Sequence, residues 1–590
     1  AMQNTNYFTA EEATVVVAVV ASFIIFLVLF FIKGPKYQGK RHVVLSPLAI
    51  VALLVVGIPI TTQAAQSSNI IASYFGYSDY GFVYGFSTSV VGRGMDKPDD
   101  YSKETIDAIE TLVDSSKEET TVSAGKEPNI ICILLESFID PYDVNFLQMS
   151  EDPIPTFHSL EQNFTTGYLT VPVVGAGTAN TEFEVLTGMS MQYFGTGEYP
   201  YKTILKQSDC PSVESIASDL SSIGYGTHVV HNNTATFYSR NNAFSKMGFD
   251  TFTSKELMNI TEYTPSGSWP TDKVLVNETV KAMDATENQS DFVYTITVGS
   301  HGDYPTEKII ENPEITVTGA ADEASNNQWE YYVNMIHNTD NFIANLIDAV
   351  NRRGEDTIIV MFGDHLPTMG LEDSDMKSGD IFKTKYATWN NFGLPKQDAD
   401  LTAYQLLAHI TGQMGIHEGT MFTYTQTQAD SSTYQNGLDN LQYDLLYGER
   451  YAYNGEDLYP ATDLVMDVED VNVTSVRKNA LNNTLAVYGS NFTKNAKIFV
   501  NGEKVPTTYL TSGILTTSLD NVSDGHVISV SITGSQGIIL RASNDEVIYE
   551  DPDVITTETE EPTEVNETES SETENSEIAN SETTNTQENN

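Results

Sequence analysis

Two apolar runs in the middle of the sequence lead to side chains that can bind a metal ion. The run NIICILLES leads to Glu136, and TIIVMFGDH leads to Asp364 and His365. Two carboxylates and one imidazole form a mixed oxygen and nitrogen set that suits Mn²⁺, with Mg²⁺ or Zn²⁺ as alternatives. The residue types therefore predict a divalent-metal site, provided that the ends of the two runs meet in the fold.

Thr178 is the candidate nucleophile that such an ion would activate. It lies in VPVVGAGTANTEFEVLTG, residues 171–188, where Gly175 and Gly177 would let backbone and substrate approach closely. A divalent ion bound to the threonine hydroxyl would lower its pKa and make an alkoxide attainable near neutral pH. A helix N-terminus directly after Thr178 would also help to hold an anionic phosphoryl group.

A purely structural interpretation explains part of the same stretch. Thr181 and Glu184 have the spacing of a capping box that starts a short helix, and Gly188 would end that helix. This interpretation leaves the glycines before Thr178 unexplained. We therefore expect Thr181 to begin the helix and Thr178 to do the chemistry.

Two further apolar runs also lead to polar residues. YGTHVVHNN leads to His231 and Asn233, and FVYTITVGSH leads to His301. In open α/β sheets, ligands bind beyond the carboxyl ends of the strands. Four runs that all stop in this way are expected to share one crevice.

The elements that must position these residues form an α/β pattern. From about 128 to 450, apolar strand-like runs alternate with amphipathic stretches, which predicts a largely parallel sheet. Apolar residues recur at helical spacing over 330–351. His337 and Asp340 lie on that predicted helix, and we interpret both as structural.

The charge balance excludes one class of partner. The 590 residues contain 81 acidic and 30 basic side chains, for a formal charge of −51. Nucleic acid binding needs clustered Lys and Arg, so nucleic acid is not expected as a partner. The only cysteines are Cys132, inside an apolar run and expected to be buried, and Cys210, and two cysteines do not make a disulfide framework.

The N-terminal region, residues 1–65, is predicted to anchor the protein in a membrane. Uncharged apolar segments at about 14–32 and 43–62 are long enough to span a bilayer. The loop between them, KGPKYQGKRH, is basic, which puts it in the cytoplasm and everything after residue 65 outside. Residues 66–127 are expected to form extracellular connecting helices.

The C-terminal part has a different character. After a polar linker at 451–466, residues 467–549 alternate apolar and polar residues with Asn-Gly and Gly-Ser turns, which is typical of an antiparallel β-sandwich. The segments YGSNF and IFVNGEKV resemble the IPT/TIG immunoglobulin-like modules. Residues 550–590 are mostly Glu, Thr, Asn and Ser and are expected to be a disordered acidic tail.

Several motifs together resemble a known family. LLESF, GAGTANTEFEVLTG, FYSR, an SH after a strand, GDH and TKYATWNNFG follow one another as in the lipoteichoic acid synthases. These are sulfatase-like phosphoglycerol transferases of the alkaline phosphatase superfamily, and the match covers about 130–400. The resemblance implies a sheet sandwiched by helices. It also implies one divalent ion, usually Mn²⁺, bound by Glu136, Thr178, Asp364 and His365.

The resemblance further implies a substrate pocket and a mechanism. The implied substrate-binding residues are Asn233, Phe237, Tyr238, Arg240, Trp269 and His301. Arg240 would clamp the phosphate and His301 would protonate the leaving oxygen. In this ping-pong scheme Thr178 attacks phosphatidylglycerol, diacylglycerol leaves, and the glycerophosphoryl group passes to a glycerol phosphate polymer or glycolipid. The implied location is the plasma membrane of a Gram-positive bacterium, with the catalytic domain outside.

The motifs also depart from the family pattern and leave alternatives open. Many members carry K-T-S-D where Gly177, Thr178, Ala179 and Asn180 stand here. These differences bear on the headgroup and acceptor more than on the chemistry. One alternative is a phosphodiesterase or sulfatase-like hydrolase of the same fold, which sequence does not separate from a transferase. Another is a catalytically inactive surface protein that binds its partner through the IPT-like module.

Overall fold

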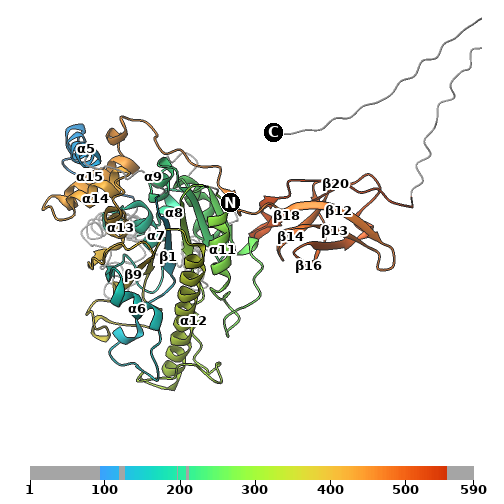
Figure 1. Ribbon diagram of the computed structural model, residues 1–590, viewed down its shortest axis with the longest axis horizontal. Helices are drawn as coiled ribbons and strands as arrows, with labels where there is room; N and C mark the ends of the chain where they lie inside the picture. The colour runs from blue at the N-terminus through green and yellow to red at the C-terminus, as the bar shows by residue number, and fades with distance from the viewer. Residues whose placement is uncertain (1–93, 119–126, 196, 207–211, 287, 554–590) are drawn as a thin grey trace, which may run out of the picture.

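The computed structural model describes residues 94–118, 127–195, 197–206, 212–286 and 288–553 (Figure 1). The predicted spans at 14–32 and 43–62 lie outside these ranges, as do Cys210 and residues 554–590 of the predicted tail. Across the described ranges, no helix has both the length and the apolar composition needed to cross a bilayer.

A mixed nine-stranded sheet forms the centre of the larger domain. Its strand order is β10-β3-β9-β8-β1-β6-β4-β5-β11. The strands are β1 (Asn129–Leu135), β3 (Thr166–Thr170), β4 (Gly226–His231), β5 (Thr251–Ser254), β6 (Asp291–Ile296), β8 (Thr357–Gly363), β9 (Lys383–Asn390), β10 (Leu401–Thr402) and β11 (Val465–Met466). Only β9 runs antiparallel to its two neighbours, β3 and β8, and every other pairing in this sheet is parallel. The prediction of a largely parallel sheet is confirmed.

Helices cover both faces of this sheet, which explains why its central strands are apolar throughout. In β1 the side chains of Ile130, Cys132 and Leu134 join one core, while Ile131 and Ile133 join the other. A strand buried on both faces has no polar side, so its sequence is a continuous apolar run rather than an alternating one.

The two layers of helices differ in size. One layer consists of α7 (Thr178–Thr187), α8 (Pro200–Thr203), α9 (Ile216–Ser222), α10 (Arg240–Lys246), α13 (Leu406–Met414), α14 (Thr420–Gln428) and α15 (Tyr434–Leu446), and α5 (Lys103–Glu118) packs against α14 and α15. The other consists of α6 (Pro155–Asn163), α11 (Val274–Asp284) and α12 (Glu323–Arg353). A short hairpin of β2 (Gln148–Met149) and β7 (Val317–Thr318) adjoins α12.

The long helix α12 contains the predicted helical segment and extends it at both ends. Asp340 accepts hydrogen bonds from the backbone N–H groups of Thr156 and Phe157 at 2.9 and 2.8 Å. These groups lie in the first turn of α6, whose own N-cap residue makes no side-chain hydrogen bond. His337 contacts the Pro153 carbonyl oxygen through Nδ1 at 2.9 Å. These contacts join two helices, in agreement with the structural interpretation of both residues.

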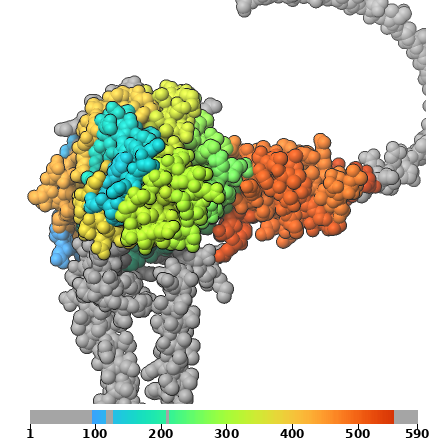
Figure 2. Space-filling model, turned by 90° about the horizontal axis from the view of Figure 1, so that it is seen from below, coloured from blue at the N-terminus to red at the C-terminus, as the bar shows by residue number. Residues whose placement is uncertain are grey.

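The C-terminal part forms two antiparallel sheets beside α11 (Figures 1 and 2). One sheet contains β12 (Asn472–Asn479), β13 (Thr484–Ser490), β17 (Ile514–Ser518) and β16 (Thr508–Thr511), and the other contains β15 (Glu503–Lys504), β14 (Ala496–Val500), β18 (Val527–Thr533), β19 (Ile539–Ala542) and β20 (Val547–Ile548). Leu485, Val487, Ile498 and Val530 are among the apolar residues buried between the sheets. The observed sheets match the antiparallel pattern expected for this region.

Two segment boundaries differ in detail from the sequence interpretation. The predicted linker at 451–466 ends in β11, which pairs with β5 and extends the main sheet. At the start of the predicted tail, Asp551 and Asp553 each lie 2.8 Å from the Lys478 ammonium group. Both segments therefore pack on the domains that they connect or follow. Helix α5 lies within the stretch predicted to contain connecting helices.

Candidate active site

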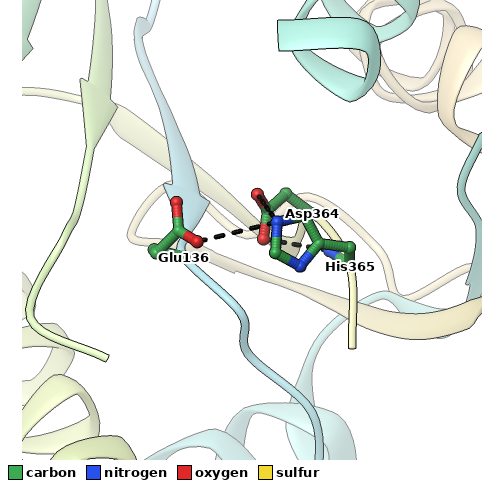
Figure 3. Close-up of side chains that lie close together, drawn as sticks. All are labelled: Glu136, Asp364 and His365. Atoms are coloured by element: carbon green, nitrogen blue, oxygen red, sulfur yellow. Dashed lines mark hydrogen bonds and ion pairs between the residues drawn. The ribbon is translucent and has the colours of Figure 1, made fainter. Parts of the chain in front are cut away.

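Three of the predicted metal ligands meet at the carboxyl end of the central sheet. Strands β1 and β8 are parallel neighbours, and their register pairs Leu135 with Gly363. The residues that follow, Glu136 on one strand and Asp364 and His365 on the other, are thereby brought together (Figure 3). All three are buried, with side-chain exposures of 5% or less. We call these three residues the catalytic cluster.

Hydrogen bonds from the backbone hold the catalytic cluster in place. Asp364 Oδ1 accepts from the N–H groups of Ser137 and His365 at 2.8 and 2.9 Å. The His365 Nδ1–H group donates to the Leu366 carbonyl oxygen at 2.9 Å. This bond leaves the lone pair on Nε2, which lies 3.3 Å from Asp364 Oδ2 and 3.6 Å from Glu136 Oε1. The arrangement presents one imidazole nitrogen and two carboxylates to a common point.

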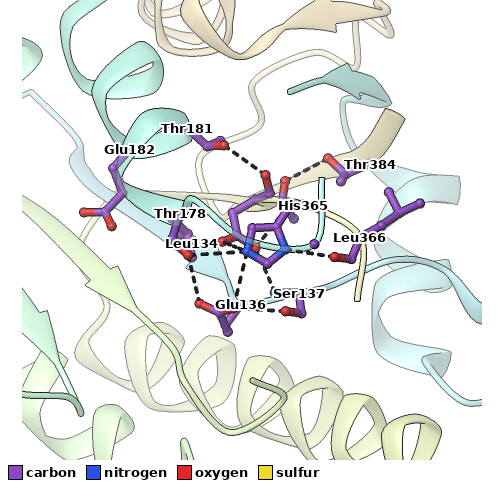
Figure 4. Close-up of polar contacts among 12 residues, drawn as sticks. Leu134, Glu136, Ser137, Thr178, Thr181, Glu182, His365, Leu366 and Thr384 are labelled. Carbon is purple, nitrogen blue, oxygen red and sulfur yellow. Dashed lines mark hydrogen bonds and ion pairs between the residues drawn. The ribbon is translucent and has the colours of Figure 1, made fainter. Parts of the chain in front are cut away.

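The Thr178 hydroxyl faces the same point from helix α7 (Figure 4). Its Oγ1 lies 3.4 Å from Glu136 Oε2 and 3.4 Å from His365 Nε2. Thr178 is the first residue of the helix, and Gly177 before it has a φ of 102°. That left-handed conformation suits glycine and places Thr178 at the positive end of the helix dipole.

The predicted start of this helix is wrong by three residues. Thr181 lies inside α7, and its hydroxyl donates to the Asp364 carbonyl oxygen at 2.9 Å instead of capping the helix. Glu184 accepts from the Met191 N–H at 2.7 Å. The capping box does not form because both side chains are used in tertiary contacts. The predicted end is confirmed, since Gly188 follows the last turn with a φ of 68°.

The catalytic cluster fits a divalent cation. Each of its three residues offers a ligand atom within 4.8 Å of the others, and the Thr178 hydroxyl lies beside them. Within the described part of the chain, Asp364 Oδ2 is buried without a hydrogen-bond partner. Burial, together with the nearby Glu136 carboxylate, raises the pKa of Asp364 above its ordinary value. A bound cation would neutralise this excess of negative charge.

A cavity of about 390 Å³ opens above Thr178 and contains most of the predicted substrate-binding residues. The predicted residues that line it are Asn233, Phe237, Tyr238, Arg240 and His301. Trp269 does not line it, but its ring packs against the His301 ring with centroids 4.4 Å apart, and its Nε1 donates to the Gly302 carbonyl oxygen. Trp269 therefore supports the wall that His301 forms.

Arg240 is the strongest anion-binding group in this cavity. Its guanidinium is buried and held by Glu182, whose Oε1 accepts from Nε at 3.2 Å and from Nη2 at 2.5 Å. Among the described residues, its Nη1 is buried without a hydrogen-bond partner. Glu182 therefore fixes the guanidinium and leaves one edge able to donate to a phosphoryl oxygen.

From the sequence, His231 is expected in the shared crevice, but it has no predicted catalytic or substrate-binding role. It is the last residue of β4, is 2% exposed and lines the cavity. Its Nδ1–H donates to the Ile296 carbonyl oxygen at 2.9 Å, and Nε2 has no partner within the described ranges. Burial and the nearby Arg240 charge lower the pKa of His231, so it presents a neutral acceptor nitrogen to the cavity. Its position after an apolar run indicated that it lies in the crevice, and its availability as an acceptor follows from the contact of Nδ1 with the Ile296 carbonyl oxygen.

Comparison with known proteins agrees with this geometry. The sulfatase family model matches residues 128–416, which is the part of the chain that contains the catalytic cluster and the cavity. The solved structure of the Streptococcus pyogenes phosphoglycerol transferase GacH, in complex with sn-glycerol-1-phosphate, has a TM-score of 0.54 to this chain. It is 22% identical, and the match covers 62% of this chain and 99% of the other. This likeness establishes the fold.

Curated relatives match over shorter shares of their length. The "Putative cyclic beta-1,2-glucan modification protein" of Rhizobium meliloti is 26% identical over 418 residues, which are 64% of this chain and 63% of the relative. The lipoteichoic acid synthase of Staphylococcus saprophyticus is 24% identical over 283 residues, covering 46% of this chain and 41% of the relative. The chain thus spans less than two thirds of the length of the relatives it matches.

Proposed function

Residues 128–416 are a sulfatase-family domain, and on this basis we propose that the protein is a metal-dependent phosphoglycerol transferase of the lipoteichoic acid synthase type. It moves glycerol phosphate from phosphatidylglycerol or a similar lipid to a glycerol phosphate polymer or glycolipid acceptor. One observation carries the proposal. The Thr178 hydroxyl at a helix N-terminus faces the catalytic cluster, and Thr178 lines the same cavity as Arg240, whose Nη1 has no hydrogen-bond partner among the described residues.

The residues of the chain divide the reaction between them. A bound divalent ion, for which Mn²⁺ is the first choice, would be held by Glu136, Asp364, His365 and Thr178 and would lower the pKa of the threonine hydroxyl. Thr178 gives up its hydroxyl proton to solvent, and Oγ1 then attacks phosphorus, so its bond to phosphorus forms as the bond to the diacylglycerol oxygen breaks. In the second half, an acceptor hydroxyl attacks the phosphothreonine and releases Thr178.

Two further side chains stabilise and complete these steps. Arg240 donates to the phosphoryl oxygens on which negative charge accumulates, and Glu182 keeps it oriented while it does so. His301 supplies a proton to the departing diacylglycerol oxygen, and Trp269 holds the imidazole against the wall. His231 accepts a hydrogen bond from a hydroxyl of the glycerol headgroup.

The setting of the reaction stays a prediction. The two spans at 14–32 and 43–62 would hold the catalytic domain at the outer face of a plasma membrane, close to a lipid donor. Origin in a Gram-positive bacterium also stays a prediction.

Incubation of the full-length protein with labelled phosphatidylglycerol and Mn²⁺ tests the proposal. We expect release of diacylglycerol together with a labelled glycerophosphate product on an acceptor. Free labelled glycerol phosphate as the sole product would indicate the hydrolase instead. No turnover with Mn²⁺, Mg²⁺ or Zn²⁺ would contradict both and favour the inactive binding protein.

A further inference from the structure

A second cavity, which we call the interdomain pocket, lies between the sulfatase-family domain and the C-terminal sheets. Its volume is about 430 Å³, within the range of roughly 300–1,000 Å³ that is typical of ligand sites, and such sites favour domain interfaces. Glu278 and Lys281 of α11 line one side, and Asn491 and Ser512 line the other. Figures 1 and 2 show the C-terminal sheets joined to the larger domain along the α11 side.

Contacts between the two domains fix the walls of the interdomain pocket. The Thr493 hydroxyl donates to the Glu256 carbonyl oxygen at 2.7 Å, and the Tyr509 hydroxyl donates to Asn259 Oδ1 at 3.1 Å. On the other wall, Lys281 Nζ lies 2.7 Å from Glu469 Oε2, which joins α11 to the segment after β11. The two domains therefore hold the cavity open in a defined shape.

The side chains that line the interdomain pocket indicate which class of ligand it binds. Carboxylates, amides and hydroxyls predominate, and the four carboxylates outnumber the two ammonium groups of Lys273 and Lys281. Such a surface repels a polyphosphate chain, whereas it offers many acceptors and several donors to sugar hydroxyls. Burial raises the pKa of Glu278 to about 7, so near neutral pH this carboxyl can also donate to a ring or glycosidic oxygen.

One hairpin, residues 260–272, connects the interdomain pocket to the active site. Near its base, the Thr271 N–H donates to the Glu262 carbonyl oxygen, and both residues line the pocket. Near its tip, Trp269 packs against His301, which lines the cavity above Thr178. The hairpin thus lines the interdomain pocket and, through Trp269, supports the His301 side of the cavity above Thr178.

We propose that the interdomain pocket binds a neutral glycan and holds it as the acceptor for the phosphoglycerol group. The acceptor role rests on the proposed function, whereas glycan binding does not. A hydroxyl of the bound glycan attacks the phosphothreonine: its oxygen bonds to phosphorus, the bond to Thr178 Oγ1 breaks, and the glycan proton passes to Thr178. The C-terminal sheets then complete the acceptor site.

A variant that fills the pocket from its exposed side tests the proposal without removing a buried group. Asn277 lines the pocket on the exposed surface of α11, so Asn277→Trp adds bulk there. Asn345→Trp, on the exposed surface of α12, is the matched control. Both full-length variants and the wild type are titrated with neutral oligosaccharides of two to six hexoses and with sn-glycerol-1-phosphate.

The proposal expects at least one oligosaccharide to bind the wild type and Asn345→Trp equally, and Asn277→Trp roughly tenfold or more weakly. Binding of sn-glycerol-1-phosphate and the single-turnover release of diacylglycerol in the absence of acceptor stay unchanged in Asn277→Trp, while transfer to the glycan falls by a similar factor. Equal glycan affinity in all three proteins, or no binding of any oligosaccharide, would overturn it. Glycan binding without turnover of phosphatidylglycerol would contradict the proposed function and the acceptor role but not glycan binding by the interdomain pocket.

Discussion

The catalytic cluster and a second group of acidic residues have nearly the same composition but opposite electrostatics. The second group, which we call the lysine cluster, consists of Asp140, His158 and Glu161 together with Lys385. Its two carboxylates and one imidazole also offer ligand atoms within 4.8 Å of one another. By composition alone, both groups are candidate metal sites.

Lys385 makes the difference between them. Its ammonium group lies 2.9 Å from Asp140 and 3.2 Å from Glu161, so the lysine cluster contains its own cation. In the described part of the chain, the carboxylates of the catalytic cluster make no ion pair with Lys or Arg, and His365 is their sole ion-pair partner. The lysine cluster is therefore neutralised by a side chain of the protein, whereas the carboxylates of the catalytic cluster have no Lys or Arg among the described residues to neutralise them.

The carboxyl pKa values reflect this difference. Burial raises the pKa of Asp140, but the hydrogen bond from His158 and the charge of Lys385 outweigh it and bring the pKa to about 2. Burial and Glu136 raise the pKa of Asp364 above its ordinary value. The lysine cluster is stabilised by its own ion pairs, whereas the catalytic cluster has an uncompensated negative charge that a metal ion could neutralise.

The largest expected effect comes from the nucleophile beside the catalytic cluster. Thr178→Ala removes the attacking hydroxyl, so diacylglycerol release should fall by at least about a thousandfold. Mn²⁺ affinity should fall much less than in a variant that lacks a carboxylate ligand, and the melting temperature should change little, because Glu136, Asp364 and His365 remain. Thr178→Ser, which keeps a hydroxyl, is the matched control. Turnover by Thr178→Ala near the wild-type rate would contradict the nucleophile assignment.

Removal of Lys385 should destabilise the folded protein, because the carboxylates of the lysine cluster would lose their internal cation. Lys385→Met removes the ion pairs of Asp143 and Glu161 and leaves Asp140 with His158 alone, so it should lower the free energy of unfolding by about 3 kcal/mol. Lys383→Met is the control for the loss of an ammonium group, because Lys383 lies on the same strand and also over the Tyr168 ring but forms no ion pair with a carboxylate in the described ranges. Urea denaturation measures both variants. Equal stability of the two would mean that Lys385 does not neutralise the cluster.

Metal titration should separate the two clusters directly. Asp364→Asn removes a ligand, and we expect Mn²⁺ affinity to fall by about a hundredfold or more. Asp140→Asn in the lysine cluster should leave Mn²⁺ affinity unchanged. Isothermal titration calorimetry on the full-length proteins gives the comparison. Loss of Mn²⁺ binding in Asp140→Asn would show that the internal cation does not exclude metal.

The smallest effect concerns pH and the lysine cluster. Burial lowers the pKa of His158, but Asp140 and Asp152 raise it more, to about 9. Since the folded-state pKa lies above the unfolded value of about 6.5, the protonated ring stabilises the fold fully below pH ~6.5, and this stabilisation is lost as the pH rises through 9. Because the ring is partly exposed, His158→Gln should cost about 1 kcal/mol at pH 6.

That cost should disappear at pH 9.5, where the wild-type ring is neutral. Chemical denaturation of wild type and His158→Gln at the two pH values measures the difference. A destabilisation of the variant that is the same at both values would assign the effect to packing rather than to charge.

Much of the active site was predictable because parallel strands share one carboxyl edge. Glu136, Asp364 and His365 follow apolar runs, and the register of β1 and β8 makes those run ends adjacent. The position of His231 at the end of β4 carried the same signal. The local pattern was misleading at Thr181. Its spacing predicted a capping box, but its hydroxyl instead donates a hydrogen bond to the Asp364 carbonyl oxygen.

The lysine cluster and the interdomain pocket had no signal in the sequence. Lys385 on β9 and Asp140 after β1 are separated by 245 residues, and only the pairing of β9 beside β8 brings them together. The interdomain pocket depends in the same way on how two separately patterned domains contact each other. The IPT/TIG likeness of the C-terminal sheets stays a prediction.

The sequence by itself determined which residues could do chemistry and which edge of the sheet would hold them, because apolar runs and strand ends are local patterns. Only the tertiary structure decided which acidic group lacks an internal cation and which nitrogen of Arg240 is left without a partner among the described residues. Those properties depend on the distances of Lys385 and Glu182 from their partners, and such distances arise when elements far apart in the chain pack together.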